Sequence, residues 1–227
     1  MTQDELKAMV ARRALDFIPT CGVIGMGSGS TVDKLIEALA SSGCRPGRVL
    51  SSSAHTTHLL EGCGIGVERT EDYDRLDVYI DGADEVAPGF ELIKGGGACL
   101  TGEKILAAMA RTFVCIVDRS KMVERLGRFP LPLEVIPGAR TMVAATLHRQ
   151  YGARAVLRDG CITDNRCQIL DVHDLDLSDP AGMETALNQI PGVVTVGLFA
   201  HRRADVVLYA TEDGVVQAEP PPSARAS

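Results

Sequence analysis

Two acidic residues directly follow an apolar segment and are candidates for acid–base chemistry. Asp81 and Asp84 come after Leu76–Ile80, a run that predicts a buried strand, and Gly82 and Ala83 separate them. Open α/β sheets bind ligands at the carboxyl ends of their strands, which is where these carboxylates fall. A single aspartate in a loop is more often a solvated surface group. Two of them, around small residues that let a ligand approach the backbone, favour a functional site.

A lysine, a glycine run and a glutamate follow. Lys94 precedes Gly95–Gly97, and these four residues are called the second glycine loop below. Glu103 falls in the first turn of a helix predicted over Thr101 to Arg111. An ammonium group beside flexible backbone amides could stabilise an oxyanion or bind a phosphate. Taken singly, the glycines could form an ordinary loop, and Glu103 could simply favour the positive end of a helix dipole. In combination with the two aspartates, these residues predict proton transfer on a small, phosphorylated, oxygen-rich substrate.

An earlier glycine-rich segment predicts an anion site. Residues 25–29, the first glycine loop, hold three glycines where a strand predicted over Cys21–Met26 leads into a helix that starts near Ser30. Backbone amides in such a turn can approach an anion closely, and the helix N-terminus adds partial positive charge. We therefore expect a phosphate to bind at this loop.

The first glycine loop does not match the common nucleotide-binding motifs. A dinucleotide fingerprint needs a third glycine, where this chain has Ser30, and an acidic residue about 20 residues further on, which the chain lacks. The next predicted strand, Arg48 to Ser52, ends in serines and leaves only a weak NADP-like pocket. A P-loop needs Lys followed by Ser or Thr after the glycines, and this pair is missing.

Other kinds of catalytic chemistry have little support. His55 and His58 are three residues apart, but no third ligand is evident nearby in the sequence, so we predict no metal site. The remaining histidines are isolated, and no GxSxG nucleophile motif occurs.

Alternating strands and helices must position these residues. Before Phe129 the alternation predicts a doubly wound, mostly parallel, Rossmann-like α/β sheet. After Pro130 and Pro132 the order becomes βαββαβ, the arrangement of a smaller ferredoxin-like α+β domain. A final hairpin, Asp205–Tyr209 with Gly214–Val216, could rejoin the first sheet. The predicted organisation is a catalytic domain of residues 1–129 and 204–219, an inserted domain of residues 130–203, and a flexible tail of residues 220–227.

Composition and charge exclude several classes of protein. The chain has 227 residues, is 45% apolar, and carries 23 Lys and Arg against 30 Asp and Glu, a formal net charge of −7. A mean hydropathy of +0.08 indicates a folded globular protein. An acidic chain without a basic stripe is a poor candidate for binding nucleic acid, and no apolar run approaches the ~20 residues of a membrane span. Seven cysteines without a CxxC pair, and the lack of a signal sequence, predict a cytoplasmic protein with a small-molecule partner.

One combination of motifs is specific. DGADE is followed by KGGG and then by a glutamate, and related segments cover nearly all of the chain before its tail: GMGSGST (25–31), SSS (51–53), YIDGADEV (79–86), LIKGGGACLTGEKI (92–105), VDRSK (117–121), FPLPLEVIP (129–137), TDN (163–165), ILDVH (169–173) and IPGVVTVGLFA (190–200). In these segments the chain closely resembles the type A ribose-5-phosphate isomerase family. The family's fold, a doubly wound domain with a smaller α+β insertion, agrees with the predicted order of elements.

The resemblance implies an activity and roles for the acidic residues. The reaction would be the reversible conversion of ribose 5-phosphate to ribulose 5-phosphate in the non-oxidative pentose phosphate pathway, without a cofactor. Glu103 would carry a proton between C2 and C1 through a cis-enediolate. Asp81, Asp84 and Lys94 would help to open the furanose ring, relay hydroxyl protons and stabilise the oxyanion. The resemblance also implies a homo-oligomer, either a dimer or a tetramer.

The resemblance further predicts which residues hold the substrate and its phosphate. These residues are Ser28, Gly29, Ser30, Thr31, Lys121 and Lys7, with the loop residues Gly82, Ala83, Gly95, Gly96 and Gly97.

Three positions near the predicted site need separate comment. Ser28 stands where the family more often has threonine, and it keeps the hydroxyl, so we expect little change. Gly102 stands where the family typically has arginine, and a glycine at a helix start would remove a charge and loosen Glu103, which would lower the rate. Cys99 is expected to be a small packed residue, and its oxidation or alkylation would block the site.

Two other functions stay open at this point. An NADP-dependent oxidoreductase would use the first glycine loop, but the missing acidic residue and the set of Asp81, Lys94 and Glu103 argue against it. A sugar-phosphate-sensing domain of a transcription regulator would have a similar fold. It would need an added DNA-binding segment, and only one predicted helix precedes Gly25.

Overall fold

The chain forms two compact units. A computed structural model describes residues 1–44 and 46–220. The first unit comprises Met1–Ala83, Gly102–Met122 and the described residues from Ala204 onward, and the second comprises Asp84–Thr101 and Val123–Arg203. The predicted flexible tail, apart from residue 220, lies outside the described residues.

The first unit is built on a six-stranded sheet with the order β13-β12-β6-β3-β1-β2. All neighbouring strands are parallel except β12 and β13, which form the antiparallel hairpin expected from the sequence and join the sheet beside β6. The strands are β1 (Val23–Met26), β2 (Arg48–Ser51), β3 (Leu76–Asp81), β6 (Ala110–Asp118), β12 (Val206–Thr211) and β13 (Gly214–Ala218).

Four α-helices accompany this sheet. Helix α1 starts with a capping box in which Thr2 accepts from the backbone of Glu5 and the Glu5 side chain accepts from the backbone of Thr2. The helices are α1 (Gln3–Ala14), α2 (Ser30–Ser42), α3 (Ala54–Gly62) and α4 (Leu100–Met109), with short 3-10 turns at η1 (Leu15–Phe17), η2 (Thr70–Asp72) and η3 (Arg119–Lys121).

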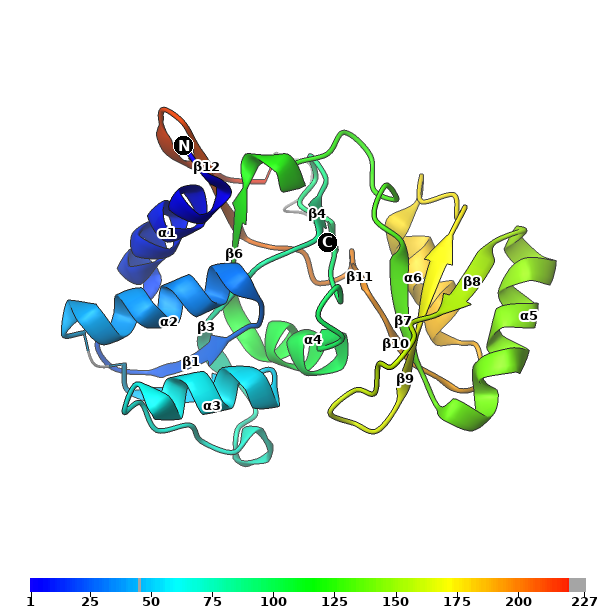
Figure 1. Ribbon diagram of the computed structural model, residues 1–227, viewed down its shortest axis with the longest axis horizontal. Helices are drawn as coiled ribbons and strands as arrows, with labels where there is room; N and C mark the ends of the chain where they lie inside the picture. The colour runs from blue at the N-terminus through cyan, green and yellow to red at the C-terminus, as the bar shows by residue number, and fades with distance from the viewer. Residues whose placement is uncertain (45, 221–227) are drawn as a thin grey trace. The chain divides into compact units, whose positions relative to one another are not determined.

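Helices cover both faces of the sheet, as the doubly wound prediction requires. Helices α1 and α2 lie side by side (Figure 1) and share an apolar core with Ile24 and Met26 of β1. A side chain at Gly25 would lie on the opposite face, because successive residues of a strand face opposite sides of the sheet. A side chain at Gly25 would meet Leu106 of α4 there. Helix α4 therefore packs on the face opposite α1 and α2.

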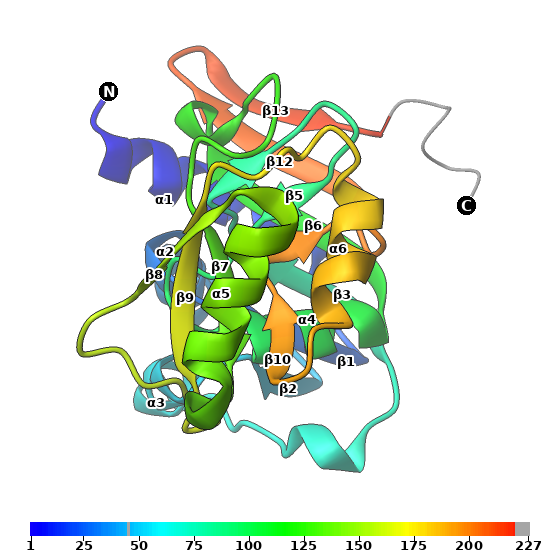
Figure 2. The same ribbon diagram turned by 90° about the vertical axis from the view of Figure 1, so that its right-hand side faces the viewer.

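The second unit contains the predicted βαββαβ motif. Its four-stranded sheet has the order β10-β7-β9-β8, and every neighbouring pair is antiparallel. Helices α5 and α6 contribute to one apolar core on this sheet, and Figure 2 shows both of them on the same face. The elements are β7 (Leu131–Val135), η4 (Pro137–Ala139), α5 (Arg140–Tyr151), β8 (Arg154–Leu157), β9 (Gln168–His173), α6 (Pro180–Asn188) and β10 (Val193–Val196).

The second unit also has a small sheet that the sequence pattern did not predict. Its order is β11-β5-β4, formed by β4 (Glu85–Val86), β5 (Leu92–Ile93) and β11 (Leu198–Phe199). The buried Glu85 carboxylate also accepts hydrogen bonds from the backbone of Gly127 at 2.7 Å and of Phe129 at 2.6 Å. The division into units therefore differs from the predicted boundaries: residues 84–101 and 123–129 group with the second unit, because these pairings tie them to it.

No helix in the described part of the chain is both long enough and apolar enough to span a membrane.

Candidate active site

The carboxyl edge of the parallel sheet collects several predicted residues of the first unit. Strands β1, β3 and β6 run in the same direction, with Met26 paired to Ile80 and Asp81 paired to Cys115. The loops that follow these strands therefore start at one edge. They carry Ser28, Gly82 and Lys121.

Asp81 ends β3 and connects two of these loops. It is fully buried, and its Oδ1 atom accepts hydrogen bonds from the backbone of Ser28 at 2.9 Å and of Gly82 at 2.7 Å. A Cβ atom at Gly27 would lie 1.9 Å from the Asp81 carboxyl carbon, so only glycine fits there. The carboxylate therefore fixes the first glycine loop against the end of β3.

Tyr79 forms a third hydrogen bond to the Asp81 carboxylate. Its hydroxyl donates to Asp81 Oδ2, and its ring packs 4.9 Å from the ring of Phe113. Burial, with the charges of Asp81 and Glu103, raises the pKa of the Tyr79 hydroxyl well above its ordinary value. Tyr79 therefore stays neutral and keeps its proton for donation.

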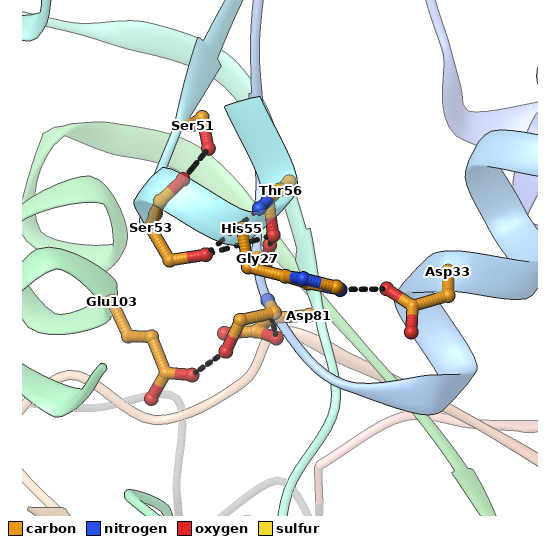
Figure 3. Close-up of polar contacts among 9 residues, drawn as sticks. Gly27, Asp33, Ser51, Ser53, His55, Thr56, Asp81 and Glu103 are labelled. Atoms are coloured by element: carbon orange, nitrogen blue, oxygen red, sulfur yellow. Dashed lines mark hydrogen bonds and ion pairs between the residues drawn. The ribbon is translucent and has the colours of Figure 1, made fainter. Parts of the chain in front are cut away.

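Glu103 lies in the first turn of α4 and is only 4% exposed. The Ser28 hydroxyl donates to Glu103 Oε1 at 2.7 Å. Tyr79 and Asp81 are two apart on β3 and share a face with Gly25, the face that α4 covers. In Figure 3 the Glu103 carboxylate points toward Asp81 and the first glycine loop. The fold thus brings together Ser28, Asp81, Gly82 and Glu103.

The first glycine loop leads into an N-terminus suited to an anion. Helix α2 begins at Ser30, and within the described residues no side chain caps its first turn. Gly29 and Ser30 are exposed, and Ser28 and Thr31 are half-buried. The amides at the start of α2 are therefore available to an anionic group.

Helix α3 also contacts the first glycine loop. Ser53 caps α3 by accepting from the backbone of Thr56, and the Thr56 hydroxyl donates to the carbonyl of Gly27 at 2.8 Å. Figure 3 shows this chain of contacts from Ser51 through Ser53 and Thr56 to Gly27. Two of the three serines of the SSS segment, Ser51 and Ser53, therefore support the first glycine loop through Thr56.

The two predicted phosphate-binding lysines lie near the same edge. Lys121 ends η3, which Asp118 caps at the carboxyl end of β6. Gln3 of α1 donates to Asp118 at 3.2 Å, and Lys7 is one helical turn after Gln3 on the same side of α1. Burial alone would raise the pKa of Asp118, but hydrogen bonds from Ser120 and Gln3 and the charge of Lys121 outweigh it and lower the pKa.

The second unit holds the remaining predicted residues. Asp84 Oδ2 accepts from the backbone of Gly96 at 2.8 Å. Lys94 is 2% exposed, and its ammonium nitrogen lies 5.7 Å from the centre of the Phe199 ring, a cation–π contact. Gly95 is buried, whereas Gly96 and Gly97 are exposed. Asp84, Lys94 and the glycines thus form a second group, while Ala83 is the last residue of the first unit before the chain enters the second.

Sequence reasoning missed a buried glutamate in the second unit. Glu134 of β7 is fully buried and accepts from the hydroxyls of Thr101 and Thr163 and from the Asn165 side chain. It ties the TDN segment to the start of α4. The TDN segment was noted in the sequence, but the contacts of Glu134 join residues about thirty positions apart, so no local pattern reveals them.

Tyr79 and Arg158 were also missed. Tyr79 could have been found, because a residue two positions before Asp81 on a strand shares its face. Arg158 gave no local signal, because its contacts with the second glycine loop join residues 62 and 63 positions apart. Among the described residues, no cluster of three metal-ligating side chains occurs.

A doubly wound sheet with a buried glutamate and an amide-rich loop at its carboxyl edge is an arrangement found in α/β enzymes, and its groups suit acid–base chemistry. The family model of ribose 5-phosphate isomerase A (phosphoriboisomerase A) matches residues 48–214. The chain belongs to this family.

Individual relatives agree over nearly the whole length. Ribose-5-phosphate isomerase A of Leptothrix cholodnii is 51% identical over 215 residues, which are 95% of this chain and 98% of the relative. The crystal structure of ribose 5-phosphate isomerase A from Neisseria gonorrhoeae is 43% identical, with a TM-score of 0.95 over 97% of this chain and 98% of that one. A D-ribose-5-phosphate isomerase solved in complex with phospho-erythronic acid is 38% identical, with a TM-score of 0.92 over 96% of this chain and all of that one.

Proposed function

We propose that this ribose-5-phosphate isomerase uses Glu103 to move a proton between C2 and C1 of its substrate. The observation that carries the proposal is the buried Glu103 carboxylate, held by the Ser28 hydroxyl at 2.7 Å beside the first glycine loop. A base with a fixed orientation and little exposure to water suits the removal of a proton from carbon.

The chemistry requires an open-chain sugar. In the open aldose, the C1 carbonyl makes the C2 proton acidic, and Glu103 removes it to give a cis-enediolate. The same carboxyl group returns the proton to C1, while a proton passes from the O2 to the O1 oxygen, and the ketose results. Atoms and charge balance without a cofactor, in keeping with the absence of a nucleotide fingerprint in the sequence.

The enediolate needs positive charge and hydrogen-bond donors near its oxygens. We assign this part to Lys94 and to the amides of the second glycine loop, and ring opening to Asp84 with Lys94. Asp81 accepts two backbone hydrogen bonds and one from Tyr79, which favours an anchoring role for it. This is a narrower role than the proton relay that the sequence suggested.

We assign the phosphate to the start of α2. Its uncapped amides, the exposed Gly29 and Ser30, and the side chains of Thr31, Lys121 and Lys7 support this assignment. A relative solved in complex with phospho-erythronic acid also binds a phosphorylated molecule. We further propose a cytoplasmic homo-oligomer, dimer or tetramer, and the seven free cysteines agree with a reducing compartment.

The test follows ketose formation from ribose 5-phosphate by purified protein in EDTA. We expect activity in the parent and a fall in kcat of about 10²- to 10⁴-fold in Glu103→Gln. Glu37→Gln is the matched control, because Glu37 is an exposed glutamate on α2 whose carboxylate pairs with Lys34 one turn away. A parent without ketose formation would refute the activity, and a fully active Glu103→Gln would refute the role of Glu103. A change in nicotinamide absorbance with sugar substrates would instead favour the oxidoreductase alternative.

A further inference from the structure

One arginine in the second unit joins the βαββαβ motif to the second glycine loop. Arg158 directly follows β8, and Asp171 lies on the neighbouring strand β9. The guanidinium forms two parallel contacts with the Asp171 carboxylate, Nε to Oδ2 at 2.9 Å and Nη2 to Oδ1. Both side chains are about one-fifth exposed, at 20% and 21%. This bidentate pairing fixes the plane of the guanidinium.

The third nitrogen of the same group binds the loop. Arg158 Nη1 donates to the carbonyl oxygens of Gly95 and Gly96, each at 3.0 Å. The Gly95 carbonyl also accepts from the backbone of Ala98 at 3.0 Å, which closes a tight turn over Gly96 and Gly97. Two successive carbonyl groups of an exposed glycine turn are therefore held by one cation.

The direction of these carbonyls determines the direction of the amides. Peptide bonds in the described residues are trans, so each N–H points opposite to the C=O of the same peptide unit. The Gly96 N–H accordingly points away from Arg158 and reaches Asp84 Oδ2 at 2.8 Å. For the same reason, the Gly97 N–H points to the side opposite Arg158.

Glycine peptides flip easily, because they lack the side chain that restricts φ and ψ. A flip at either peptide would turn a carbonyl oxygen, with its partial negative charge, toward the side of Asp84. That orientation would repel an oxyanion instead of stabilising it. The cation behind the loop opposes this flip at two consecutive peptides.

We propose that Arg158, oriented by Asp171, is a positioning residue that keeps the Gly96 amide on Asp84 and the Gly97 amide turned toward the substrate oxyanion. This inference rests on the proposed function, because it assigns the loop to the enediolate. Arg158 does not itself contact the reacting atoms in this mechanism. The Asp171 carboxylate also raises the pKa of Arg158, so its charge persists at every pH at which the enzyme works.

The experiment compares Arg158→Ala and Arg158→Lys with Arg154→Gln. Arg154 is the matched control, because it begins β8, the strand that Arg158 follows, and forms an exposed ion pair with Asp174 at 3.9 Å. Within the described residues it does not contact the loop. We expect kcat/KM to fall about 10- to 100-fold in Arg158→Ala. Inhibition by phospho-erythronic acid should weaken by a similar factor, and Arg154→Gln should match the parent in both measurements.

Two further readouts separate positioning from simple stability. Millimolar guanidinium should restore part of the kcat of Arg158→Ala and leave the parent unchanged, since the free cation can occupy the space between Asp171 and the two carbonyls. Arg158→Lys keeps the charge but cannot bind Asp171 and both carbonyls together, so we expect an intermediate kcat at parental thermal stability.

The outcomes are distinguishable. A parent that forms no ketose refutes the proposed function itself. An active parent with parental kcat/KM in both Arg158 variants overturns the role of Arg158. A loss of activity that follows the folded fraction alone, without rescue by guanidinium and without weaker inhibitor binding, also overturns it. If Arg158→Ala does not fold, Arg158→Lys decides the question, because parental kcat/KM and inhibition in that variant would contradict the proposal.

Discussion

The Ser28 hydroxyl donates a hydrogen bond to Glu103 Oε1 at 2.7 Å, while the Ser28 backbone N–H donates to Asp81 Oδ1 at 2.9 Å. One residue of the first glycine loop therefore fixes the carboxylate on α4 and is itself fixed by β3. The orientation of the proposed base depends on the loop that we assign to phosphate binding. Any change that moves this loop is expected to move Glu103 with it.

Removal of the Ser28 hydroxyl should slow the reaction. Ser28→Ala keeps the backbone contact with Asp81 but leaves Glu103 without this donor, so we expect kcat to fall about 10-fold, with little change in thermal stability. Ser28→Thr retains the hydroxyl and should stay near the parental rate. Ser41→Ala is the control, because the Ser41 hydroxyl, as far as the described residues go, bonds within its own helix to the carbonyl of Glu37. A Ser28→Ala enzyme with parental kcat would show that this hydrogen bond does not orient the base.

Tyr79 should make stability depend on alkaline pH. At neutral pH, Tyr79→Phe removes a buried donor to a carboxylate, and we expect a loss of about 1.5 to 3 kcal/mol in the free energy of unfolding. Burial, Asp81 and Glu103 raise the pKa of Tyr79 in the folded protein above the value of about 10 for an unfolded chain. The contribution of Tyr79 to the free energy of unfolding is therefore complete below pH about 10. It is lost, by about 1.4 kcal/mol per pH unit, as the pH rises toward the pKa of Tyr79 in the folded protein.

Urea unfolding between pH about 8 and about 11 measures this effect. The difference in free energy of unfolding between the parent and Tyr79→Phe should shrink above pH about 10, so their curves of stability against pH should converge. Tyr209→Phe, at a half-buried tyrosine of β12, is the control for the removal of a tyrosine hydroxyl elsewhere in the sheet. Curves for Tyr79→Phe that stay parallel to the parent through this range would contradict the role given to burial and to the two carboxylates.

The sequence predicted those parts of the fold that depend on local periodicity. Strand β3 and helix α4 lie within two residues of their predicted bounds, because an apolar run and a helical apolar stripe identify them without distant contacts. Strands β4, β5 and β11 have only two residues each and exist through pairings such as Ile93 with Leu198. Two residues carry no periodicity, so these strands, and the grouping of residues 84–101 with the second unit, had no local signal.

The same distinction applies to the site. Asp81 and Glu103 could be named from the sequence because a strand end and a helix start place them there. Arg158 and Glu134 could not, because their partners are distant in sequence and only the folded chain brings them together. The proposed base and the aspartate that anchors the first glycine loop were therefore accessible to sequence reasoning, whereas the groups that depend on distant contacts were not.

Cys99 should make the enzyme sensitive to thiol reagents. It is half-buried, and its Sγ atom lies 3.2 Å from the carbonyl oxygen of Gly97 in the second glycine loop. An alkyl group on this sulfur would displace the loop, so iodoacetamide should abolish activity in the parent, and substrate should protect it. Cys99→Ala should resist the reagent, whereas Cys63→Ala, which removes an exposed cysteine of the first unit, should remain as sensitive as the parent. Equal inactivation of Cys99→Ala and the parent would exclude this mechanism.

Gly102 should prove to be required for packing, in contrast to the looseness expected from the sequence. A Cβ atom at Gly102 would lie 2.2 Å from the backbone carbonyl oxygen of Ser52, so the first turn of α4 packs directly on the chain between β2 and α3. Gly102→Ala must displace one of these segments, and we expect it to cost about 1 to 3 kcal/mol of stability and to lower kcat by moving Glu103.

Gly62→Ala is the control, because a Cβ atom at the end of α3 would meet open space, and this substitution should be neutral or slightly stabilising. Gly102→Arg, the residue typical of the family, should also lower kcat in this chain, because its Cβ atom meets the same carbonyl. Kinetics and urea unfolding of the three variants test this, and a Gly102→Arg enzyme faster than the parent would restore the original interpretation that glycine here only loosens the base.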